Sequence, residues 1–220
     1  QHAFFEPLSV YNKTLMTEDQ TTALATLAIK HALLDQGVAH IGVPNDVQKL
    51  PYEAEIMQFE GRMPNMAYGQ EDWLIEKAAK VINQAQRPVI LAGFGARGQG
   101  TKLLKLASKI SAPIISTFRA KGVVEDSEPL YVGCHGGLGS TAAGELMDKT
   151  DLLIAIGSSF SDLSQIPKKR TVQIDINPLM IARRYPVEVG LLGNSAVLIP
   201  KLTEKVRQRE NARYVDEITR

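Results

Sequence analysis

From residue 70 to residue 210, stretches with the hydrophobic period of a helix alternate with short, uninterrupted apolar runs. The longer amphipathic stretches predict helices, and the apolar runs predict strands that are buried on both faces. The predicted helices cover residues 71–85, 100–110, 138–149 and 194–209, and the predicted strands cover residues 87–93, 112–118, 151–157 and 171–177. Because alternating strands and helices form right-handed βαβ units, we expect an α/β fold. It would be a doubly wound, mostly parallel, six-stranded Rossmann-like sheet with helices on both faces.

The residues before this domain have a different organisation. A helical pattern covers residues 17–37, with a capping box at Thr17 and Gln20 and with Gly37 placed to take the left-handed conformation at its end. A β-branched run follows at residues 38–44. Residues 49–69 contain two prolines and two glycines and have no sustained period, which predicts a linker between domains. We therefore divide the chain into a first segment (1–48), a linker (49–69), a main domain (70–210) and a tail (211–220).

Composition narrows the possible partners and the compartment. The chain has 25 Lys and Arg against 24 Asp and Glu, so its charge gives no reason to expect a nucleic acid or an anionic membrane as partner. No apolar run approaches the roughly 20 residues that span a bilayer. Cys134 is the single cysteine, which rules out an internal disulfide and a four-cysteine zinc site. We expect a soluble, cytoplasmic protein. Because it starts at Gln1, we treat it as a piece of a longer chain.

A glycine-rich turn follows the strand at 87–93. The segment from Gly93 to Gly98 has the pattern G-x-G-x-x-G, with Gly95, Ala96 and Arg97 inside it, and a helix comes next. Glycines permit a close approach of the backbone, and free N–H groups at a helix start bind phosphate. The alternative is a glycine-rich turn that binds nothing.

The end of the next strand argues against NAD. An NAD site has an acidic residue about 20 residues after the glycine motif, to bind the ribose hydroxyls. Residues 116–122 contain Thr117, Arg119 and Lys121 but no acid. Two cations and two hydroxyls suit phosphates or the 2′-phosphate of NADP. Alternatively, Arg119 and Lys121 are solvated loop charges, as isolated surface cations commonly are.

Three further strand ends carry unusual residues. They are the glycine-rich stretch 131–140, the serine-rich stretch 157–162 and the stretch 175–178. Asp175 or Asn177 could accept ribose hydroxyls, or Asp175 could cap the next helix. We expect a packing role for Cys134, because adjacent strand residues such as Cys134 and His135 point in opposite directions. Four such loops at one sheet edge predict a large, elongated ligand. We find no nucleophile elbow, Walker A sequence or metal-ligand cluster, and hence no catalytic centre.

Six separated motifs together resemble a known family. In chain order they are RPVILAGFGARG, APIISTFRAKG, YVGCHGGLG, DLLIAIGSSFSD, TVQIDINP and GLLGNSA. This series resembles the central domain of thiamine-diphosphate-dependent enzymes, in particular pyruvate oxidases and acetolactate synthases. The segments HAFFEPLSVYNKTL and GVAHIGVPNDVQ are similar to the end of the preceding pyrimidine-binding domain in that family.

The resemblance implies FAD as a cofactor, bound in extended form across the strand ends. By this similarity one group of residues would line the diphosphate and flavin side: Gly93, Gly95, Ala96 and Arg97. A second group would contact the flavin-side chain: Thr117, Ala120 and Lys121. A third group would hold the ribityl and adenosine parts: His135, Gly136, Ser158, Asp162, Asp175, Ile176 and Asn194. The family's acetolactate synthases carry Gly-Asp where this chain has Gly193-Asn194.

The resemblance also implies what lies outside this chain. The glutamate that activates thiamine diphosphate and the Gly-Asp-Gly…Asn motif that binds Mg²⁺ belong to parts of the family's proteins that these residues do not match. The expected partners are the other two domains of the same polypeptide, in a homo-oligomer. Two other functions stay open: a nucleotide-free scaffold for subunit packing, and a central domain that binds ADP or coenzyme A.

Overall fold

The computed structural model describes residues 1–52, 68–210 and 214, and the chain forms two compact units, Gln1–Asn65 and Met66–Arg220. Most of the predicted linker (49–69) and of the predicted tail (211–220) lies outside the described residues. Among the described helices, none is long and apolar enough to cross a membrane.

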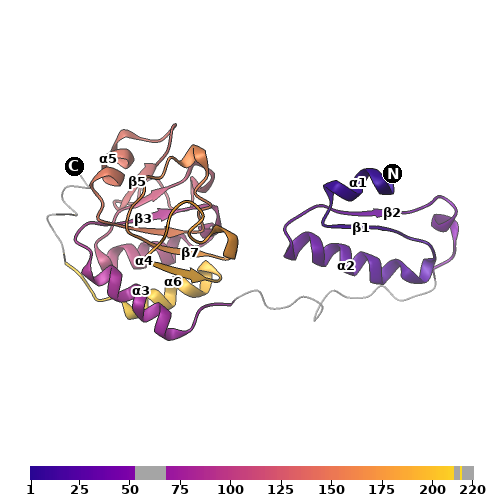
Figure 1. Cartoon of the computed structure of the whole chain (residues 1–220), viewed down its shortest axis with the longest axis horizontal. Helices are drawn as coiled ribbons and strands as arrows, with labels where there is room; N and C mark the ends of the chain where they lie inside the picture. The colour runs from indigo at the N-terminus through magenta and orange to yellow at the C-terminus, as the bar shows by residue number, and fades with distance from the viewer. Residues whose placement is uncertain (53–67, 211–213, 215–220) are drawn as a thin grey trace. The chain divides into compact units, whose positions relative to one another are not determined.

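The first unit is built on two parallel strands, β1 (Tyr11–Thr14) and β2 (Ala39–Gly42), which α2 (Thr21–Leu34) connects (Figure 1). The short helices of this unit are α1 (His2–Phe5), η1 (Glu6–Leu8), η2 (Glu18–Gln20) and η3 (Val47–Lys49).

The predicted ends of the first long helix are wrong in detail. Thr17 precedes η2 and makes no capping hydrogen bond, so the regular helix begins only at Thr21. The Gln20 side chain accepts instead from the N–H of Met16, at 3.2 Å. Gln36, with φ of 51°, takes the left-handed conformation that we expected for Gly37.

The second unit contains a six-stranded sheet in the order β5-β4-β3-β6-β7-β8, and all its neighbouring strands are parallel. The strands are β3 (Pro88–Ala92), β4 (Ile114–Ser116), β5 (Tyr131–Cys134), β6 (Leu152–Ile156), β7 (Thr171–Asp175) and β8 (Val189–Leu192). The chain runs outward from β3 to β5, returns to β6, and runs outward again to β8. The strand order therefore reverses between β3 and β6, which is the switch point where ligands bind in such sheets.

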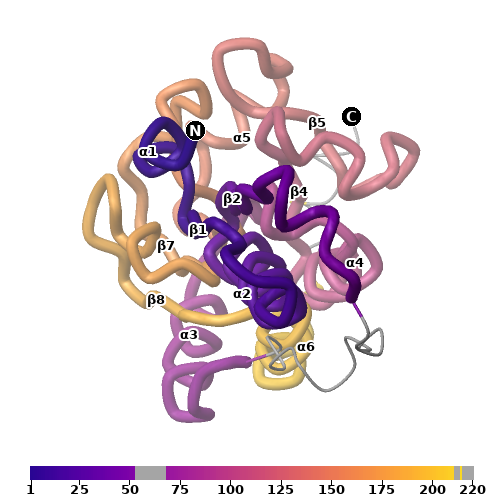
Figure 2. Tube along the Cα trace, turned by 90° about the vertical axis from the view of Figure 1, so that its right-hand side faces the viewer, coloured from indigo at the N-terminus to yellow at the C-terminus, as the bar shows by residue number. Residues whose placement is uncertain are grey.

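Helices cover both faces of this sheet, as the pattern predicts. On one face lie α3 (Asp72–Gln84), α4 (Gly100–Ile110) and α6 (Ser195–Lys205), and on the other lies α5 (Thr141–Lys149) (Figure 1). Figure 2 shows the same arrangement, with α3 and α6 side by side and α5 far from them. Ile90 and Ile154 pack toward the three-helix layer, whereas Leu91 and Leu153 pack with Met147 of α5.

The last residues before 210 cross the amino-terminal edge of the sheet. The guanidinium of Arg209 donates to the carbonyl oxygens of Ala85 and Gln86, just before β3. The carbonyl of Arg209 accepts from the Ser111 hydroxyl at 2.7 Å, just before β4. This segment therefore fixes the chain after α6 to the edge of the sheet that is formed by the amino-terminal ends of the strands.

Candidate functional site: the carboxyl edge of the sheet

The carboxyl ends of the six parallel strands form one row of loops. The short turns η4 (Phe94–Ala96), η5 (Phe118–Ala120), η6 (Asp162–Ser164) and η7 (Pro178–Met180) follow β3, β4, β6 and β7. The residues that the sequence singled out all fall at this edge. They are Gly93, Gly95, Ala96 and Arg97 after β3; Thr117, Ala120 and Lys121 after β4; His135 and Gly136 after β5; Ser158 and Asp162 after β6; Asp175 and Ile176 at the end of β7; and Asn194 after β8.

At the switch point, the glycines of two loops pack backbone against backbone. The N–H of Gly93 donates to the carbonyl of Ile156 at 2.8 Å, and that of Gly95 donates to Gly157 at 3.0 Å. A Cβ on Gly157, which has φ of +63°, would lie 2.5 Å from Cα of Gly95. These glycines are therefore required by the contact between the β3 and β6 loops, whether or not a phosphate binds above them.

Two arginines from neighbouring loops share one aromatic ring. The guanidinium carbons of Arg97 and Arg119 lie 5.2 and 4.5 Å from the ring centroid of Phe94. Among the described residues, neither guanidinium pairs with a carboxylate. Lys121, at the end of η5, is also exposed. Sequence reasoning left Arg119 as a possible solvated charge and missed Phe94. The available signal was an aromatic residue inside the glycine motif.

A cavity of about 360 Å³ lies beside β5, between η5 and the start of α5. It is lined in part by Phe118, Lys121, Tyr131 and Cys134. The Tyr131 hydroxyl and the Ser116 hydroxyl lie 2.8 Å apart, and Ser116 Oγ lies 3.3 Å from Cys134 Sγ. Burial is the main cause that raises the pKa of Tyr131. Cys134 therefore packs against polar groups and also faces the cavity.

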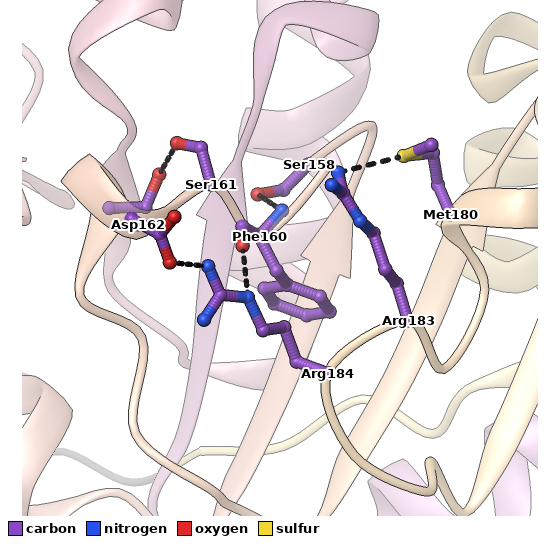
Figure 3. A network of polar contacts seen from close by, with 8 residues as sticks. Ser158, Phe160, Ser161, Asp162, Met180, Arg183 and Arg184 are labelled. Atoms are coloured by element: carbon purple, nitrogen blue, oxygen red, sulfur yellow. Dashed lines mark hydrogen bonds and ion pairs between the residues drawn. The ribbon is translucent and has the colours of Figure 1, made fainter.

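In the loop after β6, Asp162 already has a cationic partner within the protein (Figure 3). Arg184 donates to Asp162 Oδ1 and, through Nε, to the carbonyl of Phe160 at 2.9 Å. The hydrogen bond from Arg184 lowers the pKa of Asp162 below its ordinary value. Phe160 has φ of 48°, and its N–H donates to Ser158 Oγ at 3.4 Å. Sequence reasoning missed Arg184, which lies on the next loop along the chain.

At the β7 and β8 end, the predicted ribose-binding groups have partners in the protein. The Asn194 side chain accepts from the N–H of Ala196 at 2.8 Å and caps α6. The Ile176 carbonyl accepts from the Tyr68 hydroxyl at 2.9 Å, and the Tyr68 carbonyl accepts from the N–H of Asn194 at 2.8 Å. Gln70 donates to the Leu192 carbonyl at 2.9 Å. The segment from Tyr68 to Gln70 thus lies across this end of the edge.

Asp175 is buried at the end of β7 and is not a helix cap. Its carboxylate accepts from the N–H of Asn177 at 2.9 Å, while Asn177 itself caps η7. Burial raises the pKa of Asp175 above its ordinary value of 3.8. The folded protein therefore holds this proton more tightly than the unfolded chain does, and ionisation lowers stability as pH rises through the folded pKa.

The substitution Asp175→Asn should therefore raise the free energy of unfolding at pH 7. The amide keeps an acceptor oxygen for Asn177 and removes the buried charge. The gain should shrink as pH falls through the raised pKa of Asp175, because the aspartic acid of the wild type becomes neutral there. Urea unfolding at several pH values measures this difference. A variant less stable than the wild type at pH 7 would show that the charge is stabilised by something beyond these contacts.

The same edge exposes large apolar side chains. Phe94, Phe118, Leu138, Leu163 and Leu179, one from each of five loops, have exposed fractions of 47 to 86%. Within residues 1–52, 68–210 and 214, no group of three or more His, Cys, Asp or Glu side chains is placed to hold a metal ion. The edge can therefore offer cations, backbone groups and apolar contacts to a ligand.

The sheet and most of the helical residues that cover it lie in the part of the chain that matches a known family model. Residues 75–202, which span the sheet from α3 to α6, match the family model described as "Thiamine pyrophosphate enzyme, central domain". The chain belongs to the thiamine pyrophosphate enzyme family. The family that the six strand-end motifs predicted is confirmed.

Relatives within the thiamine pyrophosphate enzyme family match most of this chain, but the match covers only part of each relative's own length. YdaP of Bacillus subtilis, a putative thiamine pyrophosphate-containing protein, is 34% identical over 98% of the chain and 38% of its own length. Pyruvate oxidase of Lactiplantibacillus plantarum is 25% identical over 96% of the chain and 36% of its own length. A probable acetolactate synthase large subunit of Methanococcus aeolicus is 30% identical over 77% of the chain and 30% of its own length. The chain thus spans about a third of the length of these relatives.

Proposed function

We propose that the second unit binds FAD across the carboxyl edge of its sheet, within a thiamine-diphosphate-dependent enzyme that acts on pyruvate or another 2-oxo acid. Pyruvate oxidase and acetolactate synthase among the relatives support this substrate class. The observation that carries the proposal is the set of cations beside the switch point, Arg97, Arg119 and Lys121, of which the two arginines have no carboxylate partner among the described residues.

The residues at this edge fit an extended dinucleotide. At the switch point, the β3 and β6 loops meet through the backbones of Gly95 and Gly157, with no side chain between them. Cations lie on the β3 and β4 side, where they suit a diphosphate. The cavity beside β5 offers apolar and hydroxyl groups together with the charged side chains of Lys121 and Asp126. When bound, FAD supplies an electron acceptor. Thiamine diphosphate and Mg²⁺ would be held by other domains of the polypeptide, and the enzyme would be a homo-oligomer in the cytoplasm.

Titration of the 220-residue chain with FAD tests the proposal. We expect flavin fluorescence to be quenched on binding, and Lys121→Ala to weaken binding about tenfold, because a charge-assisted contact is lost. Lys77→Ala is a matched control, since Lys77 is an exposed lysine on α3, away from the edge, and should bind as the wild type does. Absence of quenching at saturating FAD would contradict the proposal. Tighter binding of ADP or coenzyme A than of FAD would favour that alternative ligand class.

One observation favours a second candidate, a nucleotide-free scaffold for subunit packing. Asp162, Ile176 and Asn194 already have protein partners, and five apolar side chains rim the edge. On this alternative, the rim would pack against another protein surface. Sedimentation in the presence of FAD, followed through the visible absorbance of flavin, distinguishes the two functions. A nucleotide-free scaffold would self-associate without carrying flavin absorbance, whereas an FAD-binding domain would sediment together with the flavin.

A further inference from the structure

The cluster of Phe94, Arg97 and Arg119 contains two positive charges that no carboxylate of the described residues neutralises. Arg97 follows η4 and Arg119 lies within η5, so the two guanidiniums come from different loops. Both are exposed, and both lie within 5.2 Å of the centroid of the Phe94 ring. Like charges repel, and two long side chains lose conformational freedom when they are held together.

The Phe94 ring compensates for part of this cost. The negative face of an aromatic ring attracts a guanidinium, and this attraction offsets part of the repulsion between the two cations. The ring is 47% exposed, and the arginines are not neutralised by any carboxylate of the described residues. At the same edge, Arg184 connects two loops and is neutralised by Asp162. Arg97 and Arg119 differ from it, because they have no such partner among the described residues.

The chemistry of the cluster selects the class of ligand. Each guanidinium is a planar fork of donors that matches phosphate oxygens. A diphosphate offers two linked phosphates and enough negative charge for both. Arg97 also lies two residues after Gly95, whose backbone packs against Gly157 at the switch point of the sheet.

We infer that Phe94 is a positioning residue that holds Arg97 and Arg119 together as a clamp for the diphosphate of a nucleotide. This inference rests on the proposed function and names the part of the cofactor that these loops bind. Phe94 itself contributes no charge. Its role is to keep two cations side by side before the ligand arrives, which reduces the ordering that binding would otherwise require.

Calorimetric titration of the 220-residue chain with ADP, AMP and inorganic pyrophosphate tests the clamp. We expect ADP to bind about tenfold more tightly than AMP to the wild type. Phe94→Ala should weaken ADP about five- to tenfold and bring its affinity close to that of AMP. Phe94→Trp keeps an aromatic face and should bind ADP within about threefold of the wild type, whereas Phe94→Leu should behave as the alanine variant does. Arg119→Ala should weaken ADP at least tenfold.

Phe4→Ala is the matched control. Phe4 is an exposed phenylalanine in the first compact unit, and none of the guanidiniums in the described residues lies over its ring. This variant should retain the preference for ADP over AMP. Circular dichroism melting checks that each variant folds, which we expect because Phe94 is half exposed.

The outcomes separate the clamp from the proposed function. Equal ADP affinity in the wild type and Phe94→Ala, or an equal loss in Phe4→Ala, would overturn the clamp while FAD binding stands. Failure of Phe94→Trp to restore binding would also overturn it. If FAD does not bind but pyrophosphate binds in a Phe94-dependent manner, the clamp stands and the FAD proposal fails. Absence of binding by all of these ligands would overturn both.

Discussion

Gly157→Ala should destabilise the second unit by about 3–5 kcal/mol. A residue with a side chain at φ of +63° is strained, which costs roughly 1–2 kcal/mol. The added Cβ would also lie 2.5 Å from Gly95 Cα and close to the backbone N and C atoms of Gly95. Because these atoms are backbone, the clash can be relieved only by separating the β3 loop from the β6 loop. Ligand binding at the switch point should be lost together with stability.

Urea unfolding followed through the fluorescence of Trp73, the single tryptophan, measures this effect in the second unit. Gly144→Ala is the matched control, because Gly144 is inside α5 and its Cβ would meet no atom within 4 Å. Alanine there should stabilise the unit by about 0.5–1 kcal/mol. Comparable stability of Gly157→Ala and the wild type would show that the glycine seam is not needed to hold the two loops together.

Ile154→Ala should destabilise the second unit by about 2–5 kcal/mol and lower its melting temperature by roughly 10 °C. Ile154 is fully buried at the centre of the sheet, with Ile90 of β3 and Val172 of β7 as its register partners. It belongs to the larger apolar cluster, under α3, α4 and α6. The surrounding helices contact both the sheet and one another, so they cannot collapse fully into the cavity left by the deleted atoms.

A graded series checks this cause. Ile154→Val removes one methylene and should cost about 1 kcal/mol, whereas Leu179→Ala, at a 77% exposed position, should change stability by no more than about 0.5 kcal/mol. Thermal melting and urea unfolding should rank the three variants in this order. Equal losses for Ile154→Ala and Leu179→Ala would contradict the position of Ile154 in the core.

The sheet and the position of the site could be predicted because both follow from local patterns. The apolar runs of β3, β6 and β7 are buried on both faces, which a continuous hydrophobic run indicates directly. Once those strands are parallel, their carboxyl ends must lie at one edge. The two outermost strands of the sheet were harder to predict from the sequence. β5 and β8 are short, with a glycine in each and few fully buried residues, so β8 was not identified as a strand.

The contacts within the site could not be predicted, because they depend on loop conformations. Nothing in the spacing of Asp162 and Arg184 indicates that these loops meet, and nothing near Asn194 indicates that Tyr68 donates to the neighbouring Ile176 carbonyl. From the G-x-G-x-x-G motif we predicted a close approach of the backbone to a phosphate, which stays a prediction. The neighbour that the structure places against those glycines is Gly157, a residue whose own glycine-rich turn was noted separately.

In the second unit, Tyr68 and Arg209 lie at opposite ends of the sheet. Tyr68 is bound to the ends of β7 and β8, beside the strand-end loops, whereas Arg209 is fastened before the starts of β3 and β4. The two points are separated by about one strand length, roughly 15–20 Å. Within the described residues, the second unit thus begins beside the strand-end loops, and the segment that ends at residue 210 lies at the opposite edge of the sheet.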